Sequence, residues 1–174
     1  MPIVAKASSS SYIPAPAGTH AAVCVDVVDL GVMEVNFGGK TKKQHKINIV
    51  WQIDEVREDN KPYQLWKRYT LSLHEKAGLR KDLESWRGRP FTPDELEGFD
   101  VEAVLNVGCM LSVIHNVKDG STYANVAAVM KLPKGMTAPT PRDYMRVCDR
   151  PSAEGAEVPA DYGDPPYSDE EVPF

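Results

Sequence analysis

Apolar and polar residues alternate most regularly in the segment Lys46-Ile-Asn-Ile-Val-Trp-Gln-Ile-Asp-Glu-Val56. Successive side chains of a β-strand point to opposite faces, so this alternation predicts a strand over the whole segment with one buried face. The buried face would carry Ile47, Ile49, Trp51 and Ile53. The opposite face would carry Lys46, Asn48, Val50 and Gln52. A period of two in the most apolar part of the chain indicates a mainly β fold.

A further strand is expected downstream, from about Tyr63 to Leu73, because the polar turn Arg57-Glu-Asp-Asn-Lys-Pro62 precedes it. The alternation gives an inward set of Leu65, Lys67, Tyr69, Leu71 and Leu73. The outward set is Trp66, Arg68, Thr70 and Ser72. A lysine in the inward set leaves the register of this strand open.

Upstream, the segment Thr19–Asp29 is rich in β-branched residues and predicts the first strand of the domain. Between it and Lys46 lies Phe37-Gly-Gly-Lys-Thr-Lys-Lys-Gln-His-Lys46, which we expect to form a strongly basic turn. Residues 1–13 contain a run of four serines and are expected to form a flexible N-terminal arm.

The period changes after the third strand. Leu79, Leu83 and Trp86 recur at helical spacing and predict an amphipathic helix of about ten residues. The segment Thr92-Pro-Asp-Glu95 combines an N-cap threonine, a proline at the first helical position and a glutamate that completes a capping box. It predicts the start of a second, short helix.

Two more strands are expected, from about Gly108 to Val117 and from Thr122 to Leu132, joined by the hairpin signal Asp119-Gly120. Three strands, a helical insertion and two strands follow one another in the OB-fold. We therefore expect a five-stranded OB-like barrel in residues 14–135, with the insertion between strands three and four. Residues 136–174 are rich in proline and acid and predict a disordered acidic tail.

The charge is unevenly distributed along the chain. The whole chain carries −5, whereas Asp149–Phe174 holds eight acidic residues and one basic residue, or −7, which leaves +2 for Met1–Cys148. A slightly basic domain with an acidic tail is compatible with a nucleic-acid partner. No apolar run approaches the roughly 20 residues of a membrane span, and no secretory signal is recognised, so a cytoplasmic location is expected. Three cysteines without ligand spacing (Cys24, Cys109, Cys148) agree with it.

No motif of catalytic chemistry is recognised in the sequence. The nucleophile elbow, the phosphate-binding loop and the zinc-protease motif are all missing. The histidines fall in different predicted elements: His20, His45, His74 and His115. A nuclease would need a metal-binding acidic cluster in the domain, but Asp94, Glu95 and Glu97 resemble helix-capping and surface residues. We expect no enzymatic activity, no cofactor and no metal.

The basic turn is the best candidate for contact with phosphates. Lys40, Lys42, Lys43 and Lys46 lie within seven residues, together with His45 and with Phe37, whose ring could stack on a base. A solubilising loop has the same composition. In OB-folds, however, the loop between strands one and two lines the oligonucleotide groove, which favours phosphate binding.

Trp66 and Arg68 form a second candidate, because they share the outward face of the third strand. A base stacked on such a ring contributes about 1–3 kcal/mol. The alternative is a tryptophan covered by the helical insertion or by the N-terminal arm. Trp51 and Trp86 fall on apolar faces and are expected in the core. Lys118 and Tyr123 of the last hairpin would extend the groove.

The last residues, Asp169-Glu-Glu-Val-Pro-Phe174, place an aromatic ring and its α-carboxylate behind a cluster of acids. Such a peptide can insert the ring into an apolar pocket while basic residues bind the acids. We expect Asp169, Glu170, Glu171, Val172, Pro173 and Phe174 to bind a protein partner.

These six residues resemble the acidic tip of bacterial single-stranded-DNA-binding proteins, with Val172 in place of the usual isoleucine. The domain is more similar to single-stranded-DNA-binding-like proteins of tailed bacteriophages. That similarity rests on Pro16-Ala-Gly-Thr-His-Ala-Ala-Val23, Trp86-Arg-Gly-Arg-Pro-Phe91, His115-Asn116 and Gly120-Ser-Thr-Tyr-Ala-Asn-Val126.

The resemblance implies an OB-fold that coats single-stranded DNA without sequence preference during phage DNA replication, recombination and repair in the host cytoplasm. It implies a tip that recruits replication and recombination proteins and competes for the DNA groove. A homo-oligomer such as a dimer is a further expectation. The alternative is an OB-like protein-interaction module whose acidic tail mimics nucleic acid.

Overall fold

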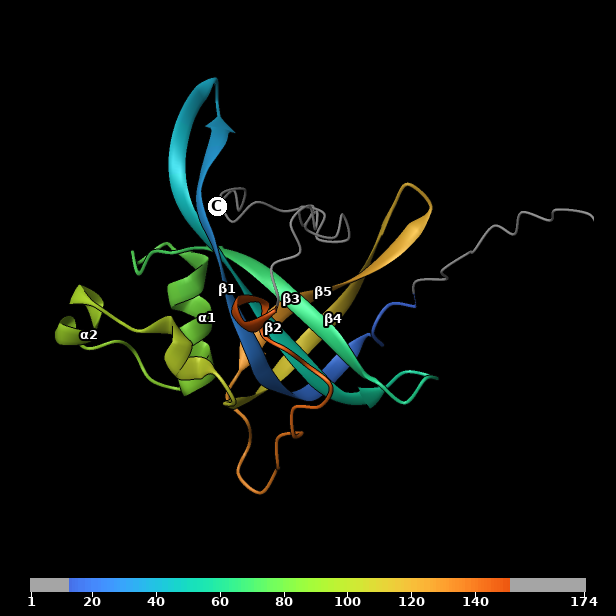
Figure 1. The fold of residues 1–174 in the computed structure, drawn as a ribbon. Coiled ribbons are helices and arrows are strands. Elements are labelled where there is room, and N and C mark those ends of the chain that lie inside the picture. Colours follow the sequence, from blue (N-terminus) through green and yellow to red (C-terminus); the bar gives the residue numbers. More distant parts are fainter. Residues whose placement is uncertain (1–12, 151–174) are drawn as a thin grey trace, which may run out of the picture.

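The computed structural model describes residues 13–150, which form a mainly β fold. Its five strands are β1 (Gly18–Phe37), β2 (Lys40–Val56), β3 (Pro62–Thr70), β4 (Gly108–Lys118) and β5 (Ser121–Met130). They form one antiparallel sheet in the order β3-β2-β1-β4-β5 (Figure 1). The edge strands β3 and β5 approach each other, but no ladder joins them in residues 13–150. The sheet is open there, and a closed OB-type barrel stays a prediction.

The helical insertion lies between β3 and β4, as the sequence predicted. It consists of α1 (Gly78–Arg87), α2 (Pro93–Glu97) and the 3₁₀ turn η1 (Val101–Val104). A second 3₁₀ turn, η2 (Val147–Asp149), follows β5. The capping box of α2 is formed, with the Thr92 side chain accepting from the Glu95 amide and the Glu95 side chain accepting from the Thr92 amide. Both predicted helices are thus confirmed.

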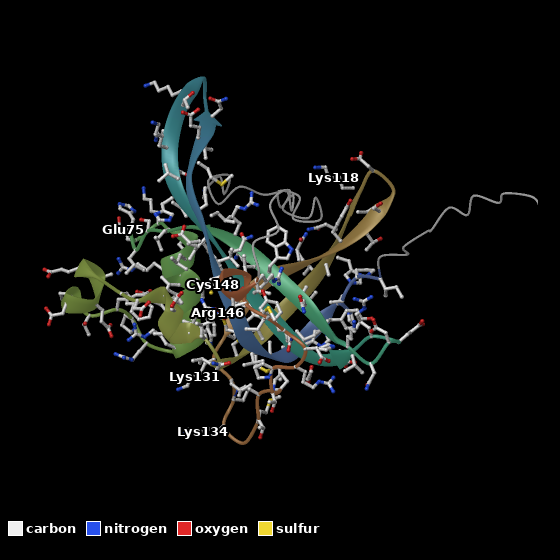
Figure 2. The ribbon with its side chains drawn as sticks, viewed as in Figure 1. Glu75, Lys118, Lys131, Lys134, Arg146 and Cys148 are labelled. Carbon is white, nitrogen blue, oxygen red and sulfur yellow. The ribbon has the colours of Figure 1, made fainter. Side chains whose placement is uncertain are left out.

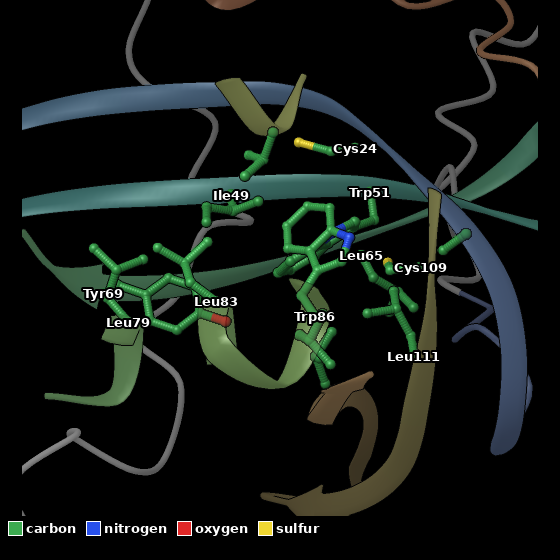
Figure 3. Packing of buried hydrophobic residues seen from close by; sticks show 14 of the residues in the cluster. Cys24, Ile49, Trp51, Leu65, Tyr69, Leu79, Leu83, Trp86, Cys109 and Leu111 are labelled. Carbon is green, nitrogen blue, oxygen red and sulfur yellow. The ribbon is translucent and has the colours of Figure 1, made fainter. Parts of the chain in front are cut away.

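The core lies between α1 and one face of the sheet, which we call the inner face (Figure 3). The predicted buried face of β2 is confirmed, since Ile47, Ile49, Trp51 and Ile53 are all at most 3% exposed. Leu79, Leu83 and Trp86 of α1 pack against them. The Trp86 indole N–H donates to the Gly108 carbonyl at 2.9 Å, and its ring lies 6.0 Å from that of Trp51. Both tryptophans are core residues, as expected.

Two thiols are part of this core. Cys24 and Cys109 are fully buried on neighbouring strands. Burial raises the pKa of both, that of Cys24 to about 12, so these thiols are protonated at neutral pH.

The third strand differs from its prediction at one end. It stops at Thr70, and Leu71, expected in the core, is 40% exposed because the chain turns away there toward α1. Lys67 does lie on the inner face. Its ammonium donates to Asp82 of α1 at 2.8 Å, and the Tyr69 hydroxyl donates to the same carboxylate at 2.6 Å. Lys67 can therefore lie on the inner face because it forms an ion pair with Asp82 of the covering helix α1.

The prediction of a long basic turn is wrong. The turn contains only Gly38 and Gly39, whose φ angles of 54° and 81° suit a two-residue hairpin. Strands β1 and β2 remain paired from Gly31 opposite Lys46 to Phe37 opposite Lys40. We call this paired extension, residues 31–46, the ribbon; it stands away from the rest of the domain (Figure 1). The lysines expected in a turn therefore have the fixed spacing of a strand.

Residues 136–150, expected in the disordered tail, are held on the sheet face opposite α1 through Arg142, Tyr144, Arg146 and Val147. We call them the strap and that face the outer face. The Gln52 amide, 1% exposed, donates to the Arg142 carbonyl at 2.7 Å and accepts from the Arg142 amide at 2.9 Å. A side chain of β2 thus holds the strap main chain as a neighbouring strand would. Residues 1–12 and 151–174 lie outside the described residues.

Candidate nucleic-acid interface

The outer face of β1, β2 and β3 changes from apolar to basic along the strands. In one cross-strand row Val50 lies between Asp26 and Trp66, and in the next row Asn48 lies between Val28 and Arg68. Lys46 then lies opposite Thr70, and its ammonium donates to the Thr70 hydroxyl at 2.6 Å. The face therefore leads from an apolar patch to cationic side chains.

The ribbon continues this face. Strand β2 pairs without interruption from Lys40 to Gln52, so its even-numbered residues share the outer side. Lys40, Lys42 and Lys46 accordingly point to the same side as Asn48 and Val50. The side chains of Lys40 and Lys42 are exposed, and that of Lys46 is half-buried.

The other predicted phosphate ligands of the ribbon lie elsewhere. Lys43 and His45 fall on the opposite side of β2, and the His45 ring contacts the Asp29 carboxylate at 2.5 Å. This hydrogen bond lowers the pKa of Asp29. Phe37 ends β1 opposite Lys40. The structure thus brings Lys40, Lys42, Lys46 and Arg68 to one face and separates Lys43 and His45 from them.

Trp66 does lie on the outer face, as the alternation predicted, but it is half-buried. It packs against the buried cluster of Val23, Val25 and Val50, as do Val28 and Tyr144 of the strap. The Arg68 guanidinium lies 5.9 Å from the centre of the indole ring. The sequence left two possible covers open, the helical insertion and the N-terminal arm. Within residues 13–150, the residue that joins Trp66 at this patch is Tyr144 of the strap and does not belong to the helical insertion, whereas residues 1–12 of the arm lie outside the described residues.

The strap is anchored by a buried carboxylate. Asp26, 1% exposed, accepts hydrogen bonds from the Tyr144 hydroxyl at 2.8 Å, from Arg146 Nε at 3.1 Å and from the Val147 amide at 2.9 Å. A buried carboxylate is tolerated only when it is paired and hydrogen-bonded. Arg146 also donates to Glu102 at 2.9 Å, and these two acceptors raise its pKa. The strap is therefore bound to the outer face by polar contacts of defined geometry.

Replacing Tyr144 with phenylalanine is expected to loosen the strap, because Asp26 loses one of its three donors. A hydrogen bond to a charged group contributes about 1.5–3 kcal/mol, which corresponds to an opening equilibrium at least about ten-fold more favourable. Hydrogen exchange of the Val147 amide, which donates to the same carboxylate, measures this opening. Tyr63→Phe, which removes a hydroxyl from a half-buried tyrosine outside the strap, is the control. Unchanged protection of Val147 in Tyr144→Phe would contradict the anchor.

The hairpin of β4 and β5 confirms the Asp119-Gly120 signal, with φ angles of 52° and 77° at the two turn residues. Lys118 pairs with Ser121 beside the turn, and Tyr123 of β5, 42% exposed, pairs with Asn116. The ribbon and this hairpin project from the same side of the domain (Figure 1), and Lys118 lies near the hairpin tip (Figure 2). Lys118 and Tyr123 therefore lie on a second arm beside the ribbon.

The sequence did not reveal two features of the structure. One is the pairing of Asp26 with the strap, more than 100 residues away in the chain. The other is a group of His20, Asp54 and Glu55, whose possible ligand atoms lie within 4.8 Å of one another; it is the one such group within residues 13–150. The His20 ring contacts the Pro16 carbonyl at 2.8 Å and approaches Asp54 at 3.9 Å. Both carboxylates are exposed, and we assign no chemistry to them.

The predicted partner-binding residues Asp169–Phe174 lie outside the described residues. No helix in residues 13–150 is both long and apolar enough to cross a bilayer. Comparison with known proteins finds neither a matching family model nor a matching curated sequence.

Proposed function

We propose that this protein binds single-stranded DNA without sequence preference. The observation that carries the proposal is the common face of Lys40, Lys42, Lys46 and Arg68, which extends from the ribbon onto the sheet. Cations in a row along a strand match the repeated phosphates of an extended nucleic acid. Binding of this kind needs only a basic track and aromatic rings, because every base has a stackable face.

The aromatic partner that we propose for a base is Tyr123, whose ring is 42% exposed on the second arm. Trp66 is half-buried on the same three valines on which Tyr144 of the strap packs, so we propose that it would stack on a base only after the strap has moved. The proposal therefore gives the ribbon and the β4–β5 hairpin the main role, and it assigns Trp66 to strap binding in the DNA-free protein.

The wider role rests on sequence alone. The acidic residues Asp169–Glu171 and the following Val-Pro-Phe174 support the recruitment of replication and recombination proteins. We propose that this recruitment takes place in the cytoplasm. The proposed activity is binding, not catalysis.

A fluorescence-anisotropy titration of a labelled single-stranded oligonucleotide at several salt concentrations tests the function. Each neutralised phosphate releases a counterion, so log K is expected to fall with log salt with a slope of about −0.7 per contact. Three ribbon lysines and Arg68 predict a slope of about −2 to −3. Binding that does not respond to salt would contradict the mechanism.

A second function has support from the strap. The outer face already holds a polypeptide segment through Gln52 and Asp26, so the same face is suited to a protein partner. A protein-interaction module would show no binding to the oligonucleotide at any salt concentration, and the same titration distinguishes the two.

A further inference from the structure

A pocket of about 490 Å³ lies beside α1, between η1, the start of β4 and the chain that follows β5. Its wall is mainly apolar and is formed by Leu83, Trp86, Phe99, Val104, Val107 and Leu132. The volume is within the range of about 300–1,000 Å³ that is usual for ligand pockets. Lys131 of its rim lies near one end of α1, far from Lys118 at the hairpin tip (Figure 2). The pocket is therefore distinct from the proposed DNA-binding face.

The rim of the pocket is basic. Arg87, Arg89 and Lys131 line it together with a single acid, Glu95. Arg87 donates to Glu95 at 2.7 Å and holds the pKa of this carboxyl down to about 2, and its guanidinium lies 4.6 Å from the Phe91 ring centre. Arg87 is thus engaged within the domain. Arg89 also approaches Glu95, at 3.5 Å, but its side chain is 60% exposed, and it lies with the exposed Lys131 at the mouth of the pocket.

We propose that the pocket binds the segment Asp169–Phe174 of the same chain. The ring of Phe174 would enter the apolar wall, and Asp169, Glu170 and Glu171 would lie against Arg89 and Lys131. No other segment outside the described residues combines three consecutive acids with an aromatic residue three positions later. The charges of segment and rim are opposite, and an aromatic ring fits a pocket lined by Trp86 and Phe99.

The connecting chain is long enough for this contact. Residues 151–174 number 24, counted from Arg150 to Phe174, and span at most about 80 Å when extended. A domain of about 150 residues has a radius of gyration of only about 15 Å, so any point on its surface is within reach. A covalently tethered segment has an effective concentration on the order of millimolar, and even a weak pocket would be occupied.

The inference has a regulatory consequence. Partner proteins would have to displace the segment from the pocket before they could bind it. DNA bound on the ribbon and outer face would not compete directly, because α1 and the sheet lie between the two surfaces. The contact therefore does not depend on the proposed DNA-binding function.

The three tryptophans provide the test, because their indole N–H signals report on different surfaces. Trp86 lines the pocket, and Trp66 lies on the outer face. In full-length protein, Phe174→Ala is expected to shift the Trp86 indole signal in a nitrogen–proton spectrum and to leave that of Trp66 in place. Adding a synthetic Asp169–Phe174 peptide to the Phe174→Ala protein should restore the Trp86 position.

Charge variants at the rim add a matched pair. Arg89→Glu should reproduce the Trp86 shift of Phe174→Ala, whereas Arg57→Glu, with a similarly exposed side chain in the β2–β3 turn, should not. A shift of the Trp66 indole signal, with that of Trp86 unchanged, would show that the segment contacts the outer face and would overturn the proposal. An unchanged Trp86 indole signal in Phe174→Ala would show that Asp169–Phe174 does not occupy the pocket. Loss of the contact on dilution would mean that it forms between two copies, which would also refute binding within one chain.

Discussion

Replacing Lys40, Lys42 and Lys46 together with glutamate is expected to lower the affinity for single-stranded DNA at least about 100-fold at about 0.1 M salt. With a slope of about −0.7 per phosphate contact, each contact contributes about five-fold in affinity at this salt concentration, and three contacts multiply to about 100-fold. The introduced carboxylates add repulsion. The slope of log K against log salt should also become shallower by about 2.

The control for this triple variant is Lys43→Glu, Arg57→Glu and Lys61→Glu. It changes the net charge by the same amount but alters the opposite side of the ribbon and the β2–β3 turn. Titrations of both variants separate a defined binding face from general charge attraction. Equal losses of DNA affinity in the two variants would contradict a defined binding face. Urea denaturation of the triple variant would check that the fold remains intact without the Lys46–Thr70 hydrogen bond.

The elements that sequence alone could predict are those whose burial follows a regular period. The alternation of Ile47, Ile49, Trp51 and Ile53 predicted the buried face of β2 correctly, because one side of the strand is fully buried under α1. The helical spacing of Leu79, Leu83 and Trp86 likewise matches the buried residues of α1. In both cases a local pattern reflects contact with a single large apolar surface.

The ribbon could not be predicted in this way because neither of its faces is buried in the domain. Its lysines lack an apolar alternation, so no strands flank Gly38-Gly39 in the sequence pattern, although this dipeptide is one that two-residue hairpins favour. The placement of Lys42 and Lys43 on opposite sides follows only once the strand is known to continue. The separation of the candidate phosphate ligands thus depended on the length of β2.

The strap could not be predicted because distant residues hold it. Tyr144, Arg146 and Val147 bond to Asp26, about 120 residues earlier in the chain, and the strap itself has the polar composition of a tail. A signal was nevertheless present. Asp26 interrupts the apolar run around Val25 and Val27, and a carboxylate in a strand of this kind needs donors from another segment.

Replacing Trp86 with alanine is expected to lower the free energy of unfolding by about 3–5 kcal/mol, the largest stability change that we predict. The ring is 5% exposed and packs against Trp51, so its removal leaves a cavity between α1 and the sheet. The substitution also leaves the Gly108 carbonyl without its indole donor. Urea denaturation monitored by circular dichroism measures the change.

Trp66→Ala is the matched control, because it removes the same side chain from a half-buried position on the outer face. Its loss should be clearly smaller than that of Trp86→Ala, since the strap covers Trp66 less completely than α1 and the sheet enclose Trp86. It should also increase hydrogen exchange in the strap, because Trp66 and Tyr144 pack on the same three valines, without the large loss of global stability expected for Trp86→Ala. Equal destabilisation by the two substitutions would mean that the outer-face cluster contributes as much to the core as the inner one. Trp66 would then be a structural residue and would not become exposed to stack on a base.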